Sequence, residues 1–246
     1  MKQTAFPVPG PFAAFLYLIR GLKLLSAPGL RRFVWAPLLI NLVLYSAGFW
    51  LAAHYFTTAM NWLIPAWLDW LRWLLWPLFA VLLLATAFFT FTLVTNLIGS
   101  PFYGLLAERV QKLRTSGELP GSGSASGMMA SFWSETRRLA YFGVRALPIL
   151  ILFLIPVANF LAPFLWMLFG AWSLSLEYMA YPLEAQGLLF TQQRAVVRQR
   201  RLDALAFGGG VMLGLAIPVF NILVPPAAVI GATLYFLDNQ PRKRQA

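Results

Sequence analysis

The sequence lacks cysteine altogether, and it has little of the other chemistry on which catalysis depends. Without cysteine there can be no disulfide, thiolate metal site or cysteine nucleophile. The chain carries one histidine and eight acidic residues, in no HExxH, Gly-x-Ser-x-Gly or phosphate-loop pattern. The stretch "FGGGVMLG" at 207–214 is glycine-rich, but Gly210 and Gly214 form a small-xxx-small pair that indicates close helix packing. We therefore expect a protein that is not an enzyme and binds no cofactor or metal.

Charged residues are also scarce. They make up 11% of the chain, whereas 60% of it is apolar, and soluble domains average about 25% charged residues. A surface with so few polar groups must largely face lipid, so the composition predicts an integral membrane protein. The net charge of +11 would suggest nucleic acid in a soluble protein. Here the basic residues flank apolar segments, so we expect membrane lipids and no nucleic acid as partners.

Two uninterrupted apolar segments are long enough to cross a bilayer. Residues 33–56 and 73–98 each exceed the roughly 20 residues that the ~30 Å hydrocarbon core requires. Residues 11–25 predict an amphipathic helix on the membrane surface. Its apolar stripe consists of Phe12, Phe15, Leu16, Ile19 and Leu22. The Gly/Ser-rich residues 116–127 predict a flexible linker.

In the last part of the chain the same helix-breaking motif occurs twice. Ile-Pro-Val-x-Asn occurs at 155–159 and again at 217–221, each time between apolar segments that are short or interrupted. We expect two helical hairpins, over 139–176 and 204–237, whose tips end inside the bilayer. The asparagine side chains could satisfy backbone groups at these turns. Irregular backbone in lipid must be buried against protein or line a water-filled path, which makes Asn159 and Asn221 pore or packing candidates. The alternative is a pair of ordinary turns at the far membrane surface.

The distribution of positive charge predicts the topology. Of the 19 lysines and arginines, only Arg72 falls in the connection between the two expected spans. The side of the membrane that holds the others also holds both termini. By the positive-inside rule this side is cytoplasmic.

The stretch "SAPGLRR" at 26–32 has the features of an anion site. Pro28 suits the first position of a helix, and N–H groups around Gly29 and Leu30 would point out of the helix N-terminus. Gly29 would let an anion approach the backbone, and Arg31 and Arg32 add charges that stay protonated. A small oxyanion such as sulfate matches this set. The alternative is that these arginines bind lipid phosphate at the membrane edge.

Other polar residues near the apolar segments are pore or gating candidates. Asn96 belongs to a group, with Gly99 and Pro101, that should break or kink the second span where it leaves the membrane. Glu108 can pair with Lys112 one helical turn later, or it can meet an arginine from elsewhere in a charged constriction. The remaining candidates are Arg109, next to Glu108, and Glu177, at the end of an apolar segment.

A basic run, "RAVVRQRR" at 194–201, places Arg194, Arg198 and Arg201 on one helix face. The sequence leaves two interpretations open. In one, the run is a helix face that lies against anionic lipid; in the other, it helps to attract a soluble anion.

Together these motifs resemble one family. The order of "GLRR", "SPFYGLLAERV", "LEYMAYPLE", "RQRR", "FGGG" and "IPVFNILVPPAAVIGAT" is similar to that in the CysZ family of bacterial sulfate permeases, over about residues 10–238. The resemblance implies a homo-oligomer in the bacterial inner membrane that takes up sulfate for assimilation into cysteine. It also implies a sulfate site at the Gly-Leu-Arg motif, here Gly29, Leu30 and Arg31, followed by Arg32. Opposite protomer orientations are proposed for the family, whereas the charge bias of this chain favours one.

The expected fold is thus an all-α integral membrane protein. It has two long transmembrane helices, an N-terminal amphipathic helix and two partly penetrating hairpins. The expected function is sulfate transport, channel-like or proton-coupled, without an ATP site. The alternative function is a membrane scaffold or regulatory protein whose arginines bind lipid phosphate.

Overall fold

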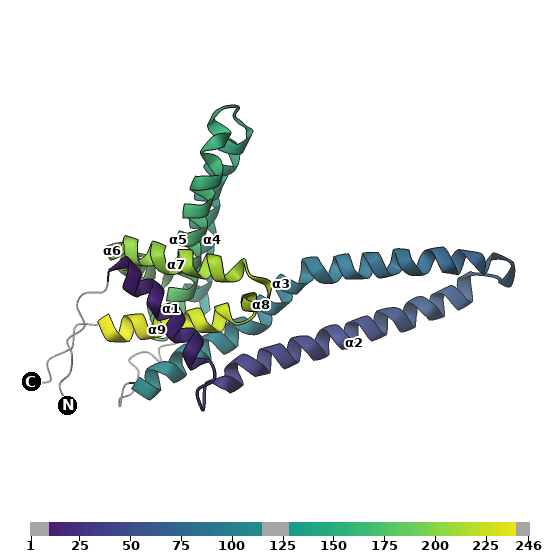
Figure 1. Ribbon diagram of the computed structural model, residues 1–246, viewed down its shortest axis with the longest axis horizontal. Helices are drawn as coiled ribbons and strands as arrows, with labels where there is room; N and C mark the ends of the chain where they lie inside the picture. The colour runs from purple at the N-terminus through teal and green to yellow at the C-terminus, as the bar shows by residue number, and fades with distance from the viewer. Residues whose placement is uncertain (1–9, 115–127, 240–246) are drawn as a thin grey trace, which may run out of the picture. The chain divides into compact units, whose positions relative to one another are not determined.

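The computed structural model describes residues 10–114 and 128–239, and every regular element in these two stretches is a helix (Figure 1). Three helical stretches in them are long and apolar enough to cross a membrane: Arg31–Leu63, Trp70–Phe91 and Ala158–Glu184. The expected all-α membrane class is confirmed. The chain forms two compact units, one of residues Arg32–Phe102 and one that runs up to Arg31 and resumes at Tyr103. We call the second the core unit. The expected linker at 116–127 lies outside the described residues.

The unit of residues Arg32–Phe102 is built from two long helices. Helix α2 (Arg31–Leu63) and helix α3 (Trp70–Arg114) are joined by a short 3₁₀ helix, η1 (Ala66–Leu68). Phe56 of α2 stacks on Phe79 of α3 with ring centroids 4.0 Å apart. Most of the large apolar side chains of both helices stay exposed, Trp62 and Trp73 among them. A surface of this kind requires lipid to cover it.

Arg72 fastens the connection between these two helices. Its Nε lies 3.0 Å from Oδ1 of Asp69, and its two terminal nitrogens donate to the Asn61 side chain and the Ile64 carbonyl. The one basic residue in this connection therefore has a structural reason to be there.

Helix α3 does not end at the expected break. It continues through Asn96 and Pro101 to Arg114. A proline removes one backbone hydrogen bond, but membrane helices tolerate this because neighbouring groups and local adjustments satisfy the freed carbonyl. Of the two expected outcomes, a break or a kink, the break is therefore wrong, and the kink stays a prediction.

The core unit buries helix α9 (Val224–Asn239) among helices α1 (Pro11–Leu24), α5 (Ala162–Glu184) and α7 (Arg201–Leu215). Glycines allow these helices to touch backbone to backbone. A Cβ at Gly21 of α1 would overlap the Ala227 carbonyl of α9, and one at Gly231 would lie 2.6 Å from the Tyr17 carbonyl oxygen. Likewise, a Cβ at Gly208 of α7 would overlap the Ala171 carbonyl of α5. These contacts confirm that the glycine-rich stretch serves packing.

Helix α1 packs against α7 and α9 through a face that the sequence did not predict. Its buried residues are Ala14, Tyr17, Leu18 and Gly21. Phe12, from the predicted apolar stripe, is 74% exposed, and Leu16 is exposed as well. Small residues decide this choice, because Ala14 and Gly21 let the helix approach its neighbours more closely than a row of large side chains would. The other stripe residues, Phe15, Ile19 and Leu22, are partly buried, and the Phe15 ring packs against Gly210 of α7.

Both expected hairpins are present, but their helices are longer than the apolar segments suggested. Helix α4 (Met128–Leu154) and α5 have 27 and 23 residues and meet at η2 (Ala158–Phe160). Helices α7 and α9 have 15 and 16 residues and meet at the short helix α8 (Pro218–Asn221). Only the second hairpin has helices below the roughly 20 residues of a full span. The four apolar segments were expected to be short or interrupted, and helices α4 and α5 exceed their segments because they continue through the interrupting residues Arg145 and Glu177.

Candidate functional site

The turn between α1 and α2 adopts a tight conformation that requires Gly29. Gly29 has φ +88°, in the left-handed region that side-chain-bearing residues rarely adopt. The Leu30 N–H donates to the Ala27 carbonyl at 3.1 Å, and the Arg31 N–H reaches the same oxygen at 3.4 Å. Leu30 itself is buried and anchors the turn in the core unit.

This geometry corrects two sequence-based expectations. Helix α2 begins at Arg31, so Pro28 lies in the turn and not at the first helical position. The Leu30 N–H is engaged, so it is not free for an anion. The positive φ of Gly29 is the physical reason, because it reverses the chain before the helix can start. Within the described residues the Gly29 N–H makes no backbone hydrogen bond, which leaves it available as a donor.

Arg109, far away in the sequence, lies beside this turn. Its Nη2 is 3.9 Å from the position of a Cβ on Gly29. Its Nε is buried and has no hydrogen-bond partner among the residues that the structure describes. In that part of the chain no carboxylate lies within ion-pair distance of Arg109 or Arg31. A buried guanidinium nitrogen without a partner favours the binding of an anion.

The two arginines at the start of α2 are both exposed. Arg31 ends the core unit and immediately follows the Gly29 turn. Arg32 begins the other unit, where its Cζ lies 4.8 Å from the ring centroid of its neighbour Phe33. The anion-site geometry that the structure describes therefore rests on Gly29 and Arg109, and Arg31 and Arg32 follow the turn along the chain.

Two of the gating candidates lie on α3. Glu108 Oε2 is 3.9 Å from Lys112 Nζ, so the pairing expected from their spacing is confirmed. Among the described residues Glu108 forms no ion pair with an arginine. Asn96 lies within the helix, and its side chain is outside what the structure describes.

Asn159 and Asn221 lie at the tips of the two hairpins, and both are exposed. Backbone bonds close each turn: the Asn159 N–H donates to Ile155 and the Asn221 N–H to Ile217, both at 2.9 Å. In the described part of the chain neither asparagine side chain caps its turn, contrary to expectation. The two copies of the motif also fold differently. Only the first has a strained residue, Val157, with φ 67° and 91% exposure.

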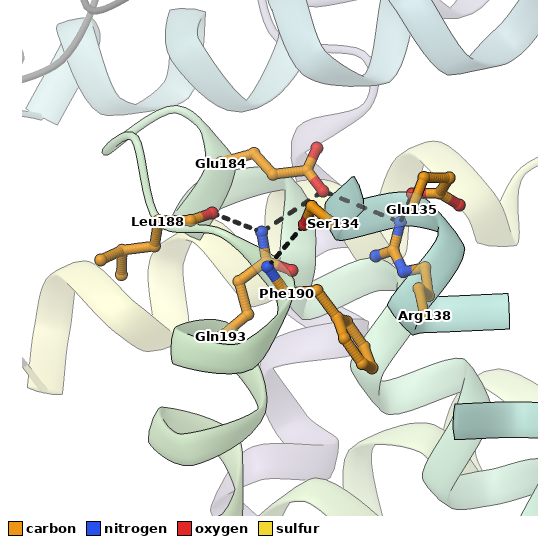
Figure 2. A network of polar contacts seen from close by, with 7 residues as sticks. All are labelled: Ser134, Glu135, Arg138, Glu184, Leu188, Phe190 and Gln193. Carbon is orange, nitrogen blue, oxygen red and sulfur yellow. Dashed lines mark hydrogen bonds and ion pairs between the residues drawn. The ribbon is translucent and has the colours of Figure 1, made fainter. Parts of the chain in front are cut away.

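Glu177 is exposed on α5 and interacts electrostatically with Arg138 and Glu135 of α4. Arg138 belongs to a polar network that the sequence did not predict (Figure 2). Its Nη1 lies 3.3 Å from Glu135 Oε2 and 3.8 Å from Glu184 Oε1.

The same network reaches the start of helix α6 (Phe190–Gln199). Gln193 Nε2 donates to the Leu188 carbonyl at 2.7 Å and to Glu184 at 3.4 Å, and the Phe190 N–H donates to Ser134 at 2.9 Å. It ties α4, α5 and α6 together. Only the Glu135–Arg138 spacing along one helix could have signalled it.

The candidates thus separate into three places. Arg109 lies beside the Gly29 turn, and Arg31 follows that turn in the chain. Asn159 and Asn221 each occupy a hairpin tip, and Glu177 lies in α5. No group of histidine and acidic residues in the described part of the chain could hold a metal ion. Only the first of these places has groups suited to one kind of ligand: its fixed positive charge and N–H donors would bind an anion.

Comparisons with known proteins agree with this chemistry. A family model described as sulfate transporter CysZ/etoposide-induced protein 2.4 matches residues 17–226. A protein of Pseudomonas fluorescens strain Pf0-1 named sulfate transporter CysZ is 44% identical over 91% of this chain and 92% of its own length. Proteins of the same name from Pseudomonas syringae pv. tomato and Pectobacterium atrosepticum are 41% and 37% identical, each over 91% of this chain and over 91% and 84% of their own lengths.

Proposed function

The chain belongs to the CysZ family of sulfate transporters, and we propose that it recognises sulfate at the Gly29 turn, with Arg31, Arg32 and Arg109 as its cationic groups. It is a membrane-embedded sulfate transporter and not an enzyme. The scaffold alternative is not favoured by this membership.

The observation that carries the proposed site is the position of Arg109. Its guanidinium lies beside a glycine turn, and its buried Nε has no partner in the described residues. Burying such a group without a partner is unfavourable, so an anion that supplies an acceptor oxygen is stabilised there. Sulfate has two negative charges and four acceptor oxygens, which suit planar guanidinium donors.

The same groups indicate how sulfate can leave as well as enter. Exposed arginines at the turn attract the dianion from water, and the Gly29 N–H and Arg109 offer donors beside them. Conduction needs binding strong enough for entry and weak enough for release. Arginines stay protonated, so this site moves no proton by itself. Proton coupling would require Glu108, Glu177 or His54, the one histidine of the sequence, to titrate along the path. A channel-like mechanism would not.

The wider setting is part of the same proposal. We place the protein in the bacterial inner membrane, with both termini in the cytoplasm, as a homo-oligomer that supplies sulfate for assimilation into cysteine. Membrane lipids cover its apolar surface. We propose that both hairpins end within the bilayer and that Asn159 and Asn221 mark a protein-lined path, with Asn96, Glu108 and Glu177 as gating residues. The exposed tips of both hairpins support this, because such backbone needs protein or water around it.

A sulfate titration of the purified protein tests the site. Sulfate should raise the thermal unfolding midpoint at constant ionic strength, and chloride should not. Replacing Arg109 with glutamine removes a charged donor, and the loss of such a bond corresponds to an affinity about tenfold or more lower.

The matched control is Arg137→Gln, which removes an exposed arginine of α4 far along the chain from the turn. This variant should bind sulfate like the unaltered protein. If Arg109→Gln binds sulfate as tightly as Arg137→Gln does, Arg109 is not part of the site.

A further inference from the structure

Helix α6 and the first residue of α7 form a positively charged groove on the surface of the core unit. The groove has a volume of about 400 Å³. It is lined by Thr191, Arg194, Ala195, Arg198, Gln199 and Arg201. Three of these six residues are arginines, and none is acidic. We call this feature the arginine groove.

The three arginines are not neutralised within the described parts of the chain. No carboxylate there lies within ion-pair distance of Arg194, Arg198 or Arg201. Their neighbour Arg200 behaves differently, because its Nη1 lies 3.8 Å from Asp203 Oδ2. Asp203 in turn accepts a hydrogen bond from Tyr235 at 2.8 Å. The carboxylate closest in sequence is therefore already engaged.

Arg194 is held in place by an aromatic ring. Its Cζ lies 5.0 Å from the ring centroid of Tyr141, on helix α4. The Tyr141 hydroxyl accepts a hydrogen bond from Trp172 Nε1 at 2.9 Å, which fixes the ring. Stacking on an aromatic face preorganises a guanidinium, so less freedom is lost when it binds a ligand.

The groove residues of α6 are carried by a helix whose opposite face is packed into the core unit. Helix α6 buries Phe190, Gln193 and Val197 against the core unit. Thr191, Arg198 and Gln199 are exposed groove residues of α6, and Arg201, the first residue of α7, is exposed as well. A hydroxyl and an amide therefore lie among the guanidinium groups, and both can bond to oxygen atoms of a ligand.

An exposed apolar residue adjoins these arginines in the sequence. Leu202 directly follows Arg201 and is 68% exposed. Arginines beside an exposed leucine match the boundary between lipid headgroups and acyl chains, where phosphate lies next to hydrocarbon. A soluble anion would gain nothing from the leucine. The occupant that fits both features is a phospholipid.

We propose that the arginine groove is a binding site for the phosphate of an anionic phospholipid headgroup. The guanidinium groups bind the phosphate oxygens, and Thr191 and Gln199 bond to the remaining polar groups of the headgroup. Leu202 contacts the adjoining acyl region. The site uses none of the residues of the sulfate site, so the two can be tested separately.

Lipid binding to the full chain in detergent, counted by native mass spectrometry, tests this proposal. The probes are short-chain phosphatidylglycerol, short-chain phosphatidylcholine and free glycerol phosphate. The protein should bind phosphatidylglycerol in preference to the other two. The double variant Arg198→Gln/Arg201→Gln should lower that affinity about fivefold for each arginine removed.

The charge-matched control is Arg114→Gln/Arg137→Gln, which removes two exposed arginines outside the groove. It should bind phosphatidylglycerol normally. A second variant, Thr191→Glu, puts a negative charge into the groove, at a helix position where carboxylates are tolerated. It should also weaken binding.

Three outcomes would overturn the proposal. Equal losses in the groove variant and the control would mean that only net charge matters. Normal binding by Thr191→Glu would place the lipid elsewhere. Glycerol phosphate binding as tightly as phosphatidylglycerol would make the occupant a soluble phosphate and not a lipid.

Discussion

At the residue scale, single glycines determine the turn before α2 and the close packing of the helices. Gly29 allows the reversed turn next to Arg109, and Gly208 allows the backbones of α5 and α7 to touch. Both roles agree with what the sequence indicated, namely a close approach at Gly29 and helix packing at 207–214. The position of Arg109 could not be predicted in the same way. Its neighbour in space is 80 positions earlier in the chain, and no local pattern reports such a contact.

Adjacent glycines on α7 offer a matched pair for a stability prediction. A Cβ at Gly208 would overlap the backbone of Ala171, whereas one at Gly209 would meet nothing within 4 Å. Gly208→Ala should therefore destabilise the protein by ~1–3 kcal/mol, the usual effect of overpacking. Gly209→Ala should be neutral or stabilising by up to ~1 kcal/mol, because alanine favours helix. Thermal unfolding in detergent compares them, and equal midpoints for the two variants would show that α5 and α7 do not pack this way.

At the element scale, the sequence predicted the order of the helices better than their ends. The expected spans, hairpins and N-terminal helix all have counterparts. The observed helix ends differ from the predicted ones because a charged residue interrupts an apolar run without interrupting the helix. Arg145 is an example: it stays in α4, and its Cζ lies 3.7 Å from the Tyr141 ring centroid. The buried face of α1 was missed for a related reason, since a hydropathy pattern ranks large side chains above the small ones that permit contact.

The depth to which the two hairpin tips enter the membrane can be measured by cysteine labelling. The chain contains no cysteine, so Asn159→Cys or Asn221→Cys introduces its only thiol. A tip that ends within the bilayer should react slowly with a membrane-impermeant maleimide applied from the far face, because the reagent needs a water-exposed thiolate. The reference is Asp69→Cys, in the connection between α2 and α3.

Reaction of both tip thiols as fast as the thiol at position 69 would mean that the tips lie in water at the far surface. The hairpins would then cross the membrane completely. Helix α5, which is long and apolar enough to cross, makes this test most informative for Asn159.

At the scale of the whole molecule, composition was the most reliable guide. Few charges and many apolar residues predicted a membrane protein, and the helices and their exposed apolar surface confirm it. Family membership supplies sulfate as the transported ion. Physical reasoning from the residues reaches a small oxyanion and no further, because guanidinium groups and N–H donors recognise charge and oxygen geometry that several oxyanions share.

The central claim is that sulfate crosses the membrane by way of the Gly29 turn and its arginines. Uptake of radiolabelled sulfate into proteoliposomes tests it most directly. The unaltered protein and Arg137→Gln should conduct sulfate equally. Arg31→Gln and Arg109→Gln should each reduce the flux, by about tenfold if one charged hydrogen bond is lost, and the double variant should reduce it further. A double variant that conducts sulfate as fast as the unaltered protein would contradict the account.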